Sequence, residues 1–391
     1  MDALTTPLPK DWEIKTFRDI STINQGLQIP ISQRLKAPTE HAKFYITIQA
    51  LNNRKEFEYI KTYNESVVCH KDDILMTRTG NTGMVITNIE GVFHNNFFKI
   101  NFDRTLINKD FLVYFLSLEQ TQKTILRKAG TSTIPDLNHN DFYSLSIPLP
   151  PLNEQIAIAN ILSDLDRYLY SLDALILKKE SVKKALSFEL LSQGKRLKGF
   201  NQNWQRVRLG DVGKPCMCKR VMKHQTTRYG EIPFYKIGTF GNTADAFISK
   251  KLFLEYKTKY SFPKKGDILI SASGTIGRAV IYDGKPAYFQ DSNIVWIDND
   301  ETLVKNDFLF YAYSNVKWNT EHTTILRLYN DNFRNTLIPL PPLNEQIAIA
   351  NILSDVDSEI ISLKNKKRQF DNIKKALNHD LMSAKIRVLK K

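Results

Sequence analysis

An internal repeat divides this chain into two halves. Residues 147–164 read IPLPPLNEQIAIANILSD, and the identical 18 residues recur at 338–355, 191 positions later. This period is far longer than the roughly 20–50 residues of solenoid repeats, so the chain holds two copies of one large unit. Each copy has a globular part followed by a nearly invariant connector.

The similarity between the halves weakens outside this block without ending. Related segments beyond it are 183–186 with 374–377, 73–83 with 267–277, 12–20 with 204–212 and 110–112 with 307–309, and Arg196 recurs as Arg387. The connectors have thus stayed alike while the globular parts have diverged. We therefore expect the connectors to contact one shared type of partner and the globular parts to contact two different targets.

The connectors are predicted to be long helices. Pro148, Pro150 and Pro151 break the preceding strand and fix an extended approach, and Asn153 is a candidate N-cap. Apolar residues then follow at alternating steps of four and three, which is a heptad stripe. The stripes comprise Ile158, Leu162, Leu165, Leu169, Leu172 and Ile176 in the first copy and Ile349, Leu353, Val356, Ile360 and Leu363 in the second.

Two such helices can cover each other's stripes by packing side by side, most simply antiparallel. A helix from 153 to 193 would be roughly 60 Å long at 1.5 Å per residue. Each helix would then be a rod that separates two globular domains. The alternative is an ordinary core helix inside a larger domain.

The globular parts show the β-branched and aromatic runs of strands, for example at 43–51, 91–101 and 287–297. Short helices are predicted at 108–118 and 305–313. The predicted fold class is α+β with a pseudo-two-fold internal repeat. It has two mixed α/β domains, residues 1–147 and 196–337, separated by two long antiparallel helices within 148–195 and 338–391.

The charge of the chain favours a polyanionic partner. It has 55 Lys and Arg against 41 Asp and Glu, a formal net charge of +14. Binding to nucleic acid uses such an excess, because each phosphate that is neutralised releases counterions. A merely basic protein is the alternative. An odd count of three cysteines, no secretory apolar segment and no run long enough to span a membrane favour the cytoplasm.

Motifs of enzymes are not found in the sequence. It has no GxxxxGK[ST] phosphate loop, no G-x-G-x-x-G after a strand and no Asn-Pro-Pro-aromatic tetrapeptide of amino-methyltransferases. The pair Cys216 and Cys218 departs from the usual zinc spacing, and no second pair follows. We therefore predict no catalytic residue, no metal site and no cofactor in this chain.

Two glycine turns are candidates for reading bases. Residues 79–83 and 273–277 follow matching strands, and glycines allow a close approach to another backbone. Thr, Ser, Asn and Arg beside them can bond phosphates or base edges, although a plain hairpin turn is an equal alternative. The predicted DNA-binding residues are Arg78, Thr79, Asn81, Lys128, Thr131 and Ser132 in the first half, and Ser273, Thr275, Arg278, Thr323 and Arg327 in the second.

With its paired PLPPLNEQ blocks at 148–155 and 339–346, each opening a heptad helix, the whole chain resembles the specificity (S) subunit of type I restriction–modification systems. The resemblance implies two target-recognition domains, each of which reads one half of a bipartite, asymmetric site in double-stranded DNA. The paired helices would set the gap between the half-sites.

The resemblance also implies partners. Two modification (M) subunits, which bring S-adenosylmethionine, would dock on the helices, and restriction (R) subunits, which use ATP and Mg, join in systems that also cut DNA. We expect these residues to serve helix pairing and the partner interface: Asn153, Glu154, Gln155, Leu162, Leu165 and Leu169 with Asn344, Glu345, Gln346, Leu353, Val356 and Ile360.

Two rival interpretations remain at this stage. The first is a self-contained nuclease or methyltransferase, which would need a catalytic constellation. The second is a scaffold whose coiled coil joins two modules without binding DNA, and salt-sensitive DNA affinity would distinguish it. The sequence gives neither the recognised bases nor the length of the gap.

Overall fold

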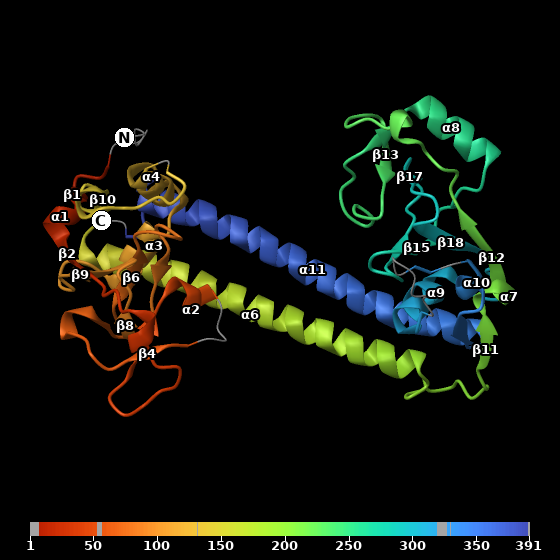
Figure 1. Cartoon of the computed structure of the whole chain (residues 1–391), viewed down its shortest axis with the longest axis horizontal. Coiled ribbons are helices and arrows are strands. Elements are labelled where there is room, and N and C mark those ends of the chain that lie inside the picture. Colours follow the sequence, from red (N-terminus) through yellow and green to blue (C-terminus); the bar gives the residue numbers. More distant parts are fainter. Residues whose placement is uncertain (1–7, 53–56, 131, 319–326, 329, 390–391) are drawn as a thin grey trace. The chain divides into compact units, whose positions relative to one another are not determined.

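The two halves of the repeat do not fold as two consecutive pieces of chain. The computed structural model describes residues 8–52, 57–130, 132–318, 327–328 and 330–389 (Figure 1). The first unit combines Met1–Asp173 with Asn365–Lys391, and the second is Ala174–Lys364. Each unit therefore contains one globular part, the first half of its own connector helix and the last half of the other connector helix.

The globular part of the first unit is built on two four-stranded sheets. One is antiparallel with the order β2-β9-β6-β7, and the other has the order β4-β3-β8-β5, in which β3 and β8 run parallel. The strands are β1 Glu13–Thr16, β2 Ser21–Gln25, β3 Lys43–Ile46, β4 Tyr59–Ile60, β5 Val68–Cys69, β6 Ile74–Thr77, β7 Val85–Ile86, β8 Gly91–Phe93, β9 Phe97–Phe102 and β10 Ser146–Leu149. The short helices are α1 Phe17–Ile20, η1 Ile31–Gln33, α2 Ile48–Asn52, η2 Glu65–Val67, α3 Lys109–Leu116, α4 Glu119–Ala129 and α5 His139–Tyr143.

The globular part of the second unit repeats this plan. Its antiparallel sheet has the order β12-β18-β15-β16, and its mixed sheet has the order β14-β13-β17. The strands are β11 Gln205–Arg208, β12 Gly213–Met217, β13 Ile232–Tyr235, β14 Phe247–Ile248, β15 Ile268–Ser271, β16 Ala279–Ile281, β17 Tyr288–Phe289, β18 Ile294–Asn299 and β19 Leu337–Leu340. The short helices are α7 Leu209–Val212, η3 Lys223–Gln225, α8 Lys250–Lys259, α9 Asn306–Ala312, η4 Tyr313–Asn315 and α10 Asn330–Arg334.

A two-stranded sheet closes each globular part at the point where the connector leaves it. β1 pairs antiparallel with β10, with Ile14 opposite Pro148, and β11 pairs with β19 in the same way. Proline is accepted here because each of these strands has a single partner, so the ladder does not need every N–H. The repeated Pro-Leu-Pro-Pro segment therefore joins the last strand of the sheet directly to a helix.

Each connector forms one helix of 40 residues, α6 Leu152–Leu191 and α11 Leu343–Met382, about 60 Å long at 1.5 Å per residue. The prediction that Asn153 caps the helix from outside is wrong, because α6 already begins at Leu152. The side chain of Asn153 accepts a hydrogen bond from the Glu154 N–H within the first turn. Pro151, whose missing N–H costs nothing at a helix start, leads the chain into that turn instead.

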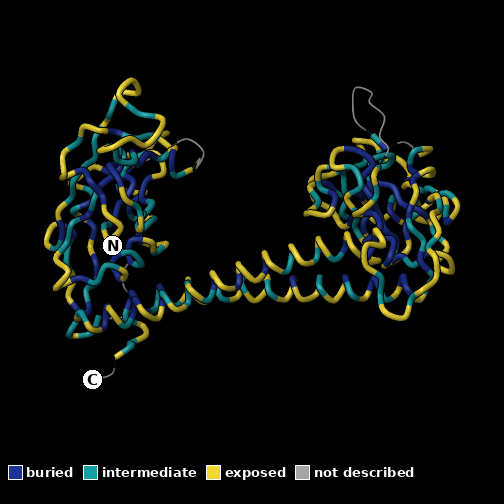
Figure 2. Tube along the Cα trace, turned by 90° about the horizontal axis from the view of Figure 1, so that it is seen from below, coloured by how far each residue is buried: buried dark blue, intermediate teal, exposed yellow. Residues whose placement is uncertain are grey.

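The two helices pair antiparallel within each unit, as the heptad stripes predict. In the first unit Lys374 pairs with Asp166 and Lys367 with Asp173, so residue numbers fall along one helix as they rise along the other. Exposed ion pairs contribute little, about 0–1 kcal/mol each. The pairing depends instead on the apolar stripe, in which Leu162, Leu169, Leu172, Ile176, Leu353 and Ile360 are buried and Leu165 and Val356 are half-buried (Figure 2).

The ends of both helices belong to the cores of the globular parts. In the first unit Leu162 of α6 and Leu381 and Met382 of α11 lie in the same apolar cluster as Phe17 and Phe111. The cluster of the second unit takes the corresponding residues, with Leu353 from the start of α11 and Leu190 and Leu191 from the end of α6. Neither globular core is complete without the helix that comes from the other half of the sequence.

Three predicted strands are interrupted by features that single-residue preferences do not reveal. The strand expected at 43–51 ends at Ile46, because the Thr47 hydroxyl accepts the Ala50 N–H and starts α2. The strand expected at 91–101 is two strands joined by a turn at 94–96, and the one at 287–297 breaks in the same way at 290–293. The predicted helices at 108–118 and 305–313 are confirmed as α3 and α9.

Truncating Leu162 tests the contribution of the helix to the globular core. Leu162 is fully buried, so Leu162→Ala should lower the free energy of unfolding by about 2–5 kcal/mol. The exposed Ile156 on the same helix gives a matched control, Ile156→Ala, with an expected change below about 0.5 kcal/mol. Urea unfolding followed by circular dichroism measures both. Equal stability of the two variants would contradict the shared core.

Candidate nucleic-acid interface and helix junctions

The predicted glycine turns have the same geometry in both units. Gly80 and Gly83 have φ of 85° and 89°, and Gly274 and Gly277 have φ of 64° and 81°. L-residues with a side chain rarely adopt this left-handed region, so glycine is required there. In each loop the hydroxyl at the end of the preceding strand, Thr77 or its equivalent in β15, accepts a backbone N–H from across the turn.

A second loop, which precedes the connector, lies against each glycine turn. In the first unit the Leu137 N–H donates to the Arg78 carbonyl at 2.8 Å, and the Arg78 guanidinium pairs with Asp136 at 2.6 Å. In the second unit the Leu328 N–H donates to the Ala272 carbonyl at 2.8 Å. The residues joined by these two backbone hydrogen bonds are 59 and 56 positions apart in the sequence, so the segments are neighbours in the same way in both units.

A hairpin turn completes the arrangement in each unit. The Arg78 N–H donates to the Asn96 carbonyl, and the Ala272 N–H donates to the Asn293 carbonyl, both at 2.8 Å. We name these three neighbouring segments the loop cluster. It consists of residues 78–83, 94–96 and 132–137 in the first unit, and of residues 272–278, 290–293 and 327–328 in the second.

The predicted DNA-binding residues occupy different places in these clusters. Asn81, Thr275 and Arg278 are exposed, and so is Ser132, whose hydroxyl donates to the Ile134 carbonyl. Arg278 also donates to the Gly241 carbonyl at 3.3 Å. All four side chains are accessible to a ligand. Thr131 and Thr323 lie outside the described residues.

Other predicted residues are engaged within the chain. Ser273 is buried and donates to the Asn293 side chain, Arg327 donates to the Ser292 carbonyl, and Thr79 is half-buried. Lys128 donates to the Ser144 hydroxyl. Their geometry suits them to holding the loops in place.

The sequence did not single out a basic cavity beside the second cluster. The cavity has a volume of about 560 Å³, and four cationic side chains line it against one carboxylate. The cations are Arg220, Lys223, Lys236 and Arg327, and the carboxylate is Asp291. The excess of Lys and Arg was visible in the sequence, but the residues lie up to 107 positions apart, and only folding brings them together.

A buried carboxylate lies at the start of each connector helix. Glu154, 2% exposed, accepts hydrogen bonds from the Trp12 indole N–H at 3.1 Å and from Arg387 at 2.7 Å. These hydrogen bonds, together with a second ion pair to Asp11, raise the pKa of Arg387. In the second unit Glu345 accepts from the Trp204 indole and from Arg196, both at 2.8 Å.

The glutamine that follows each glutamate is buried as well. Gln155 accepts the Asn108 N–H at 2.9 Å and donates to the carbonyls of Leu106 and Pro150. Gln346 makes the same three hydrogen bonds in the second unit, to Lys305, Leu303 and Pro341. The Glu-Gln pair of the repeat therefore binds the helix to the globular part of its own unit.

A tyrosine on α3, and its equivalent on α9, contacts both long helices. Tyr114 of α3 donates to Asp166 of α6 at 2.8 Å, and Lys374 of α11 lies over its ring and pairs with the same Asp166. Burial, together with this carboxylate, raises the pKa of Tyr114 above its ordinary value. Tyr311, Asp357 and Lys183 form the equivalent group in the second unit.

Part of the repeated block is exposed. Asn153, Ile156 and Asn160 follow at steps of three and four, so they share one face of α6, and Ile156 is 41% exposed. Asn344, Ile347 and Asn351 are exposed on the same face of α11, with Ile347 43% exposed. The packing of the units does not account for the identity of these residues.

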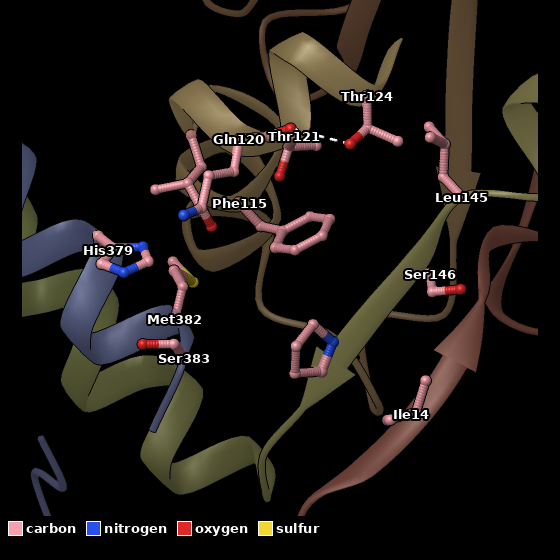
Figure 3. Close-up of a pocket in the computed structure, with 12 residues that line it drawn as sticks. Ile14, Phe115, Gln120, Thr121, Thr124, Leu145, Ser146, His379, Met382 and Ser383 are labelled. Carbon is pink, nitrogen blue, oxygen red and sulfur yellow. Dashed lines mark hydrogen bonds between the residues drawn. The ribbon is translucent and has the colours of Figure 1, made fainter. Parts of the chain in front are cut away.

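A cavity of about 240 Å³ lies in the first unit between α4, the β1–β10 sheet and the end of α11 (Figure 3). Phe115, Leu145, Ile14, Met382 and His379 are among the residues that line it. No carboxylate or cysteine is among the described residues that line it. This composition is typical of a packing gap between elements rather than of an acid–base site.

The cysteines show no sign of activation. Burial raises the pKa of Cys69 and of Cys218 to about 12, and it also raises the pKa of Cys216. Within the described ranges, no three His, Cys, Asp or Glu residues gather as a metal site would require. The described helices likewise include none with the length and apolar character of a membrane span.

Comparisons with known proteins agree on one family. The family model for the type I restriction modification DNA specificity domain matches residues 9–179 and again 201–370. This chain belongs to the type I restriction–modification specificity subunits. A putative type I restriction enzyme specificity subunit of Haemophilus influenzae is 41% identical over 367 residues, which cover 88% of each chain.

More distant members of the family share the full length. The type I restriction enzyme MjaVIII specificity subunit of Methanocaldococcus jannaschii is 25% identical, over 97% of this chain and 94% of its own. The fold is similar to the crystal structure of an S subunit from M. genitalium, with a TM-score of 0.59 at 17% identity over 96% of this chain and 98% of that one. The predicted family and α+β fold of a specificity subunit are confirmed.

Neutralising the buried carboxylate of the second unit tests the helix junction. In Glu345→Gln an amide replaces an acceptor of two donors, so the Arg196 guanidinium loses its counter-ion. We expect a loss of about 2–4 kcal/mol in the free energy of unfolding. The control Glu359→Gln removes an exposed ion pair with Lys179 and should cost less than about 1 kcal/mol. Urea titration separates the two, and equal losses would contradict a structural role for Glu345.

Proposed function

We propose that this chain is the non-catalytic, DNA-reading subunit of a type I complex. Each target-recognition domain, residues 1–147 and 196–337, binds one half of a bipartite, asymmetric site in double-stranded DNA. The observation that carries the proposal is the pair of loop clusters, which have one backbone arrangement but different side chains. Two loop clusters with the same backbone and different side chains suit two half-sites of different sequence.

The charge supports DNA as the ligand. A net charge of +14 suits contacts to phosphate, and the cavity beside the second cluster gathers four cations. The exposed Asn81, Thr275 and Arg278 are the proposed contacts in the glycine turns, while Arg78 and Ser273 position those turns. Backbone contacts fix the register, and side chains at base edges give the sequence preference.

The paired helices, residues 148–195 and 338–391, set the gap between the half-sites in this proposal. Each is a continuous helix of 40 residues. A helix pair held by interlocking apolar stripes resists bending, so its length fixes a distance that the two domains can span on DNA. S-adenosylmethionine belongs to the M subunits and ATP with Mg to the R subunits, so methyl transfer and cleavage lie outside this chain.

One experiment tests both reading and spacing. The chain is co-expressed with the M subunit of its system, and single-molecule sequencing maps methylated bases in host DNA. We expect a bipartite, asymmetric motif that appears only when this chain is present. Removing residues 172–178 and 363–369 keeps the flanking helix pairs in register and shortens the pair by about 10 Å, or three base pairs.

The shortened chain should methylate a motif with a shorter gap, or methylate no motif. An unchanged gap would contradict the ruler. Leu175→Ala with Leu177→Ala changes exposed residues of the same segment without changing its length, so its gap should equal that of the wild type. A stable complex without any motif would favour the scaffold interpretation.

We further propose that the exposed repeated face of each helix start docks one M subunit. Buried residues of the repeat are explained by the fold, but Asn153, Ile156 and Asn160 and their copies are exposed and still identical. Two copies of one partner would require two identical surfaces. The exposed isoleucine at the centre of each face supplies the apolar anchor that hot spots of interfaces use.

Charged substitutions on this face should change the stoichiometry of the complex. Ile156→Asp should leave one M subunit bound, and Ile156→Asp with Ile347→Asp should leave none, because a desolvated carboxylate disfavours the contact. Native mass spectrometry of co-purified complexes measures this. Ile373→Asp, exposed on α11 outside the repeat, is the control and should retain two. Two M subunits on the double variant would place the interface elsewhere.

A further inference from the structure

The loop that follows β2 or β12 presents a different side chain in each unit at the same position. Gln28 is the third residue after β2, and Arg220 is the third residue after β12. In both units a short 3-10 helix, η1 or η3, begins three residues later. Both side chains are exposed. The same position in the loop therefore carries an amide in the first unit and a guanidinium in the second.

The hairpin turn of the loop cluster supplies a partner at an equivalent position. Asn95 is the second residue after β8, and Asp291 is the second after β17. The strands before them pair alike, with Phe93 opposite Ile46 and Phe289 opposite Tyr235. The chemistry of the turn has therefore changed together with that of the neighbouring loop.

The two positions are hydrogen-bonded in both units. The Asn95 amide donates to the Gln28 side-chain oxygen at 3.1 Å. The Arg220 Nε–H donates to Asp291 at 2.8 Å, with the arginine side chain 67% exposed and the aspartate 14% exposed. No described residue accepts a hydrogen bond from the terminal nitrogens of Arg220, so they remain available to a ligand.

We propose that these two pairs are specificity determinants, and that Gln28 with Asn95 reads an adenine in one half-site while Arg220 with Asp291 reads a guanine in the other. The proposal rests on the proposed function, since it assumes that the loop clusters face DNA. Side-chain amides bond adenine at N6 and N7, and the arginine fork bonds guanine at O6 and N7. Asp291 holds the fork in one orientation, as a bidentate contact requires.

Phosphate binding alone does not account for this arrangement. The amide pair of the first unit carries no charge, so attraction to phosphate gives no reason for it. In the second unit Asp291 offsets the charge of Arg220, which weakens a purely electrostatic contact while it fixes direction. Lys223 and Lys236 in the adjoining cavity are the groups suited to the phosphates of DNA.

Exchanging the pairs tests the proposal in the full complex. Arg220→Gln with Asp291→Asn gives the second unit the pair of the first, and Gln28→Arg with Asn95→Asp does the reverse. Single-molecule sequencing of host DNA should show one guanine of the second half-site replaced by adenine in the former. It should show one adenine of the first half-site replaced by guanine in the latter. The other half-site and the gap should not change.

A third variant and a control complete the design. Arg220→Lys keeps the charge but loses the fork, and it should lower discrimination for that guanine about tenfold or more. Arg220→Lys also tests the proposal if a variant with exchanged pairs fails to form the complex. Lys285→Gln, at the opposite end of β17 and 85% exposed, should leave the motif as it is.

The outcomes separate the two proposals. Motifs unchanged in all three variants would overturn the base-reading role. So would a uniform loss of methylation in an assembled complex, with no change of base, because that is the behaviour of a phosphate contact. Absence of any bipartite motif with the wild-type chain would instead overturn the proposed function itself.

Discussion

The structure depends on a buried carboxylate at the start of each long helix. An ion in the protein interior is costly unless it is paired and hydrogen-bonded, and Glu154 meets this condition through Trp12 and Arg387. The tryptophan lies at the start of the globular part of the same half, whereas the arginine lies in the segment that follows α11, the helix of the other half. One charged group therefore requires three distant segments to be present together, and Glu345 imposes the same requirement in the second unit.

This requirement explains why each unit takes in both helices. If the end of α11 and the segment after it were absent, Glu154 would lose its counter-ion Arg387 and the apolar cluster would lose Leu381 and Met382. The end of α6 has the same role for the second unit through Leu190 and Leu191. Removing one half of the chain would therefore expose part of the apolar core of the other.

Much of this fold could be predicted because it follows from local periodicity and from the internal repeat. The heptad stripes gave the helices and their antiparallel pairing, and the glycine spacing gave the left-handed turns. The contacts of Arg387 with Glu154 and of Arg78 with Asp136 could not be predicted, since each depends on where distant segments end in space. The matched pairs Trp12 with Trp204 and Arg196 with Arg387 were a visible signal, but a repeat alone does not say which residues meet.

The same reasoning separates the parts of the molecule that must stay alike from those free to differ. Substitution is costly at the residues that join helix and domain. A change in Gln155, for example, would leave three backbone groups without that hydrogen-bond partner. Exposed residues of the loop clusters are less constrained, because backbone hydrogen bonds and glycines already hold the loops. Gln28 and Arg220 lie beside these clusters and are exposed, so either side chain can change without disturbing a buried junction. If the two domains read unlike half-sites, as proposed, one repeated fold can supply both readers.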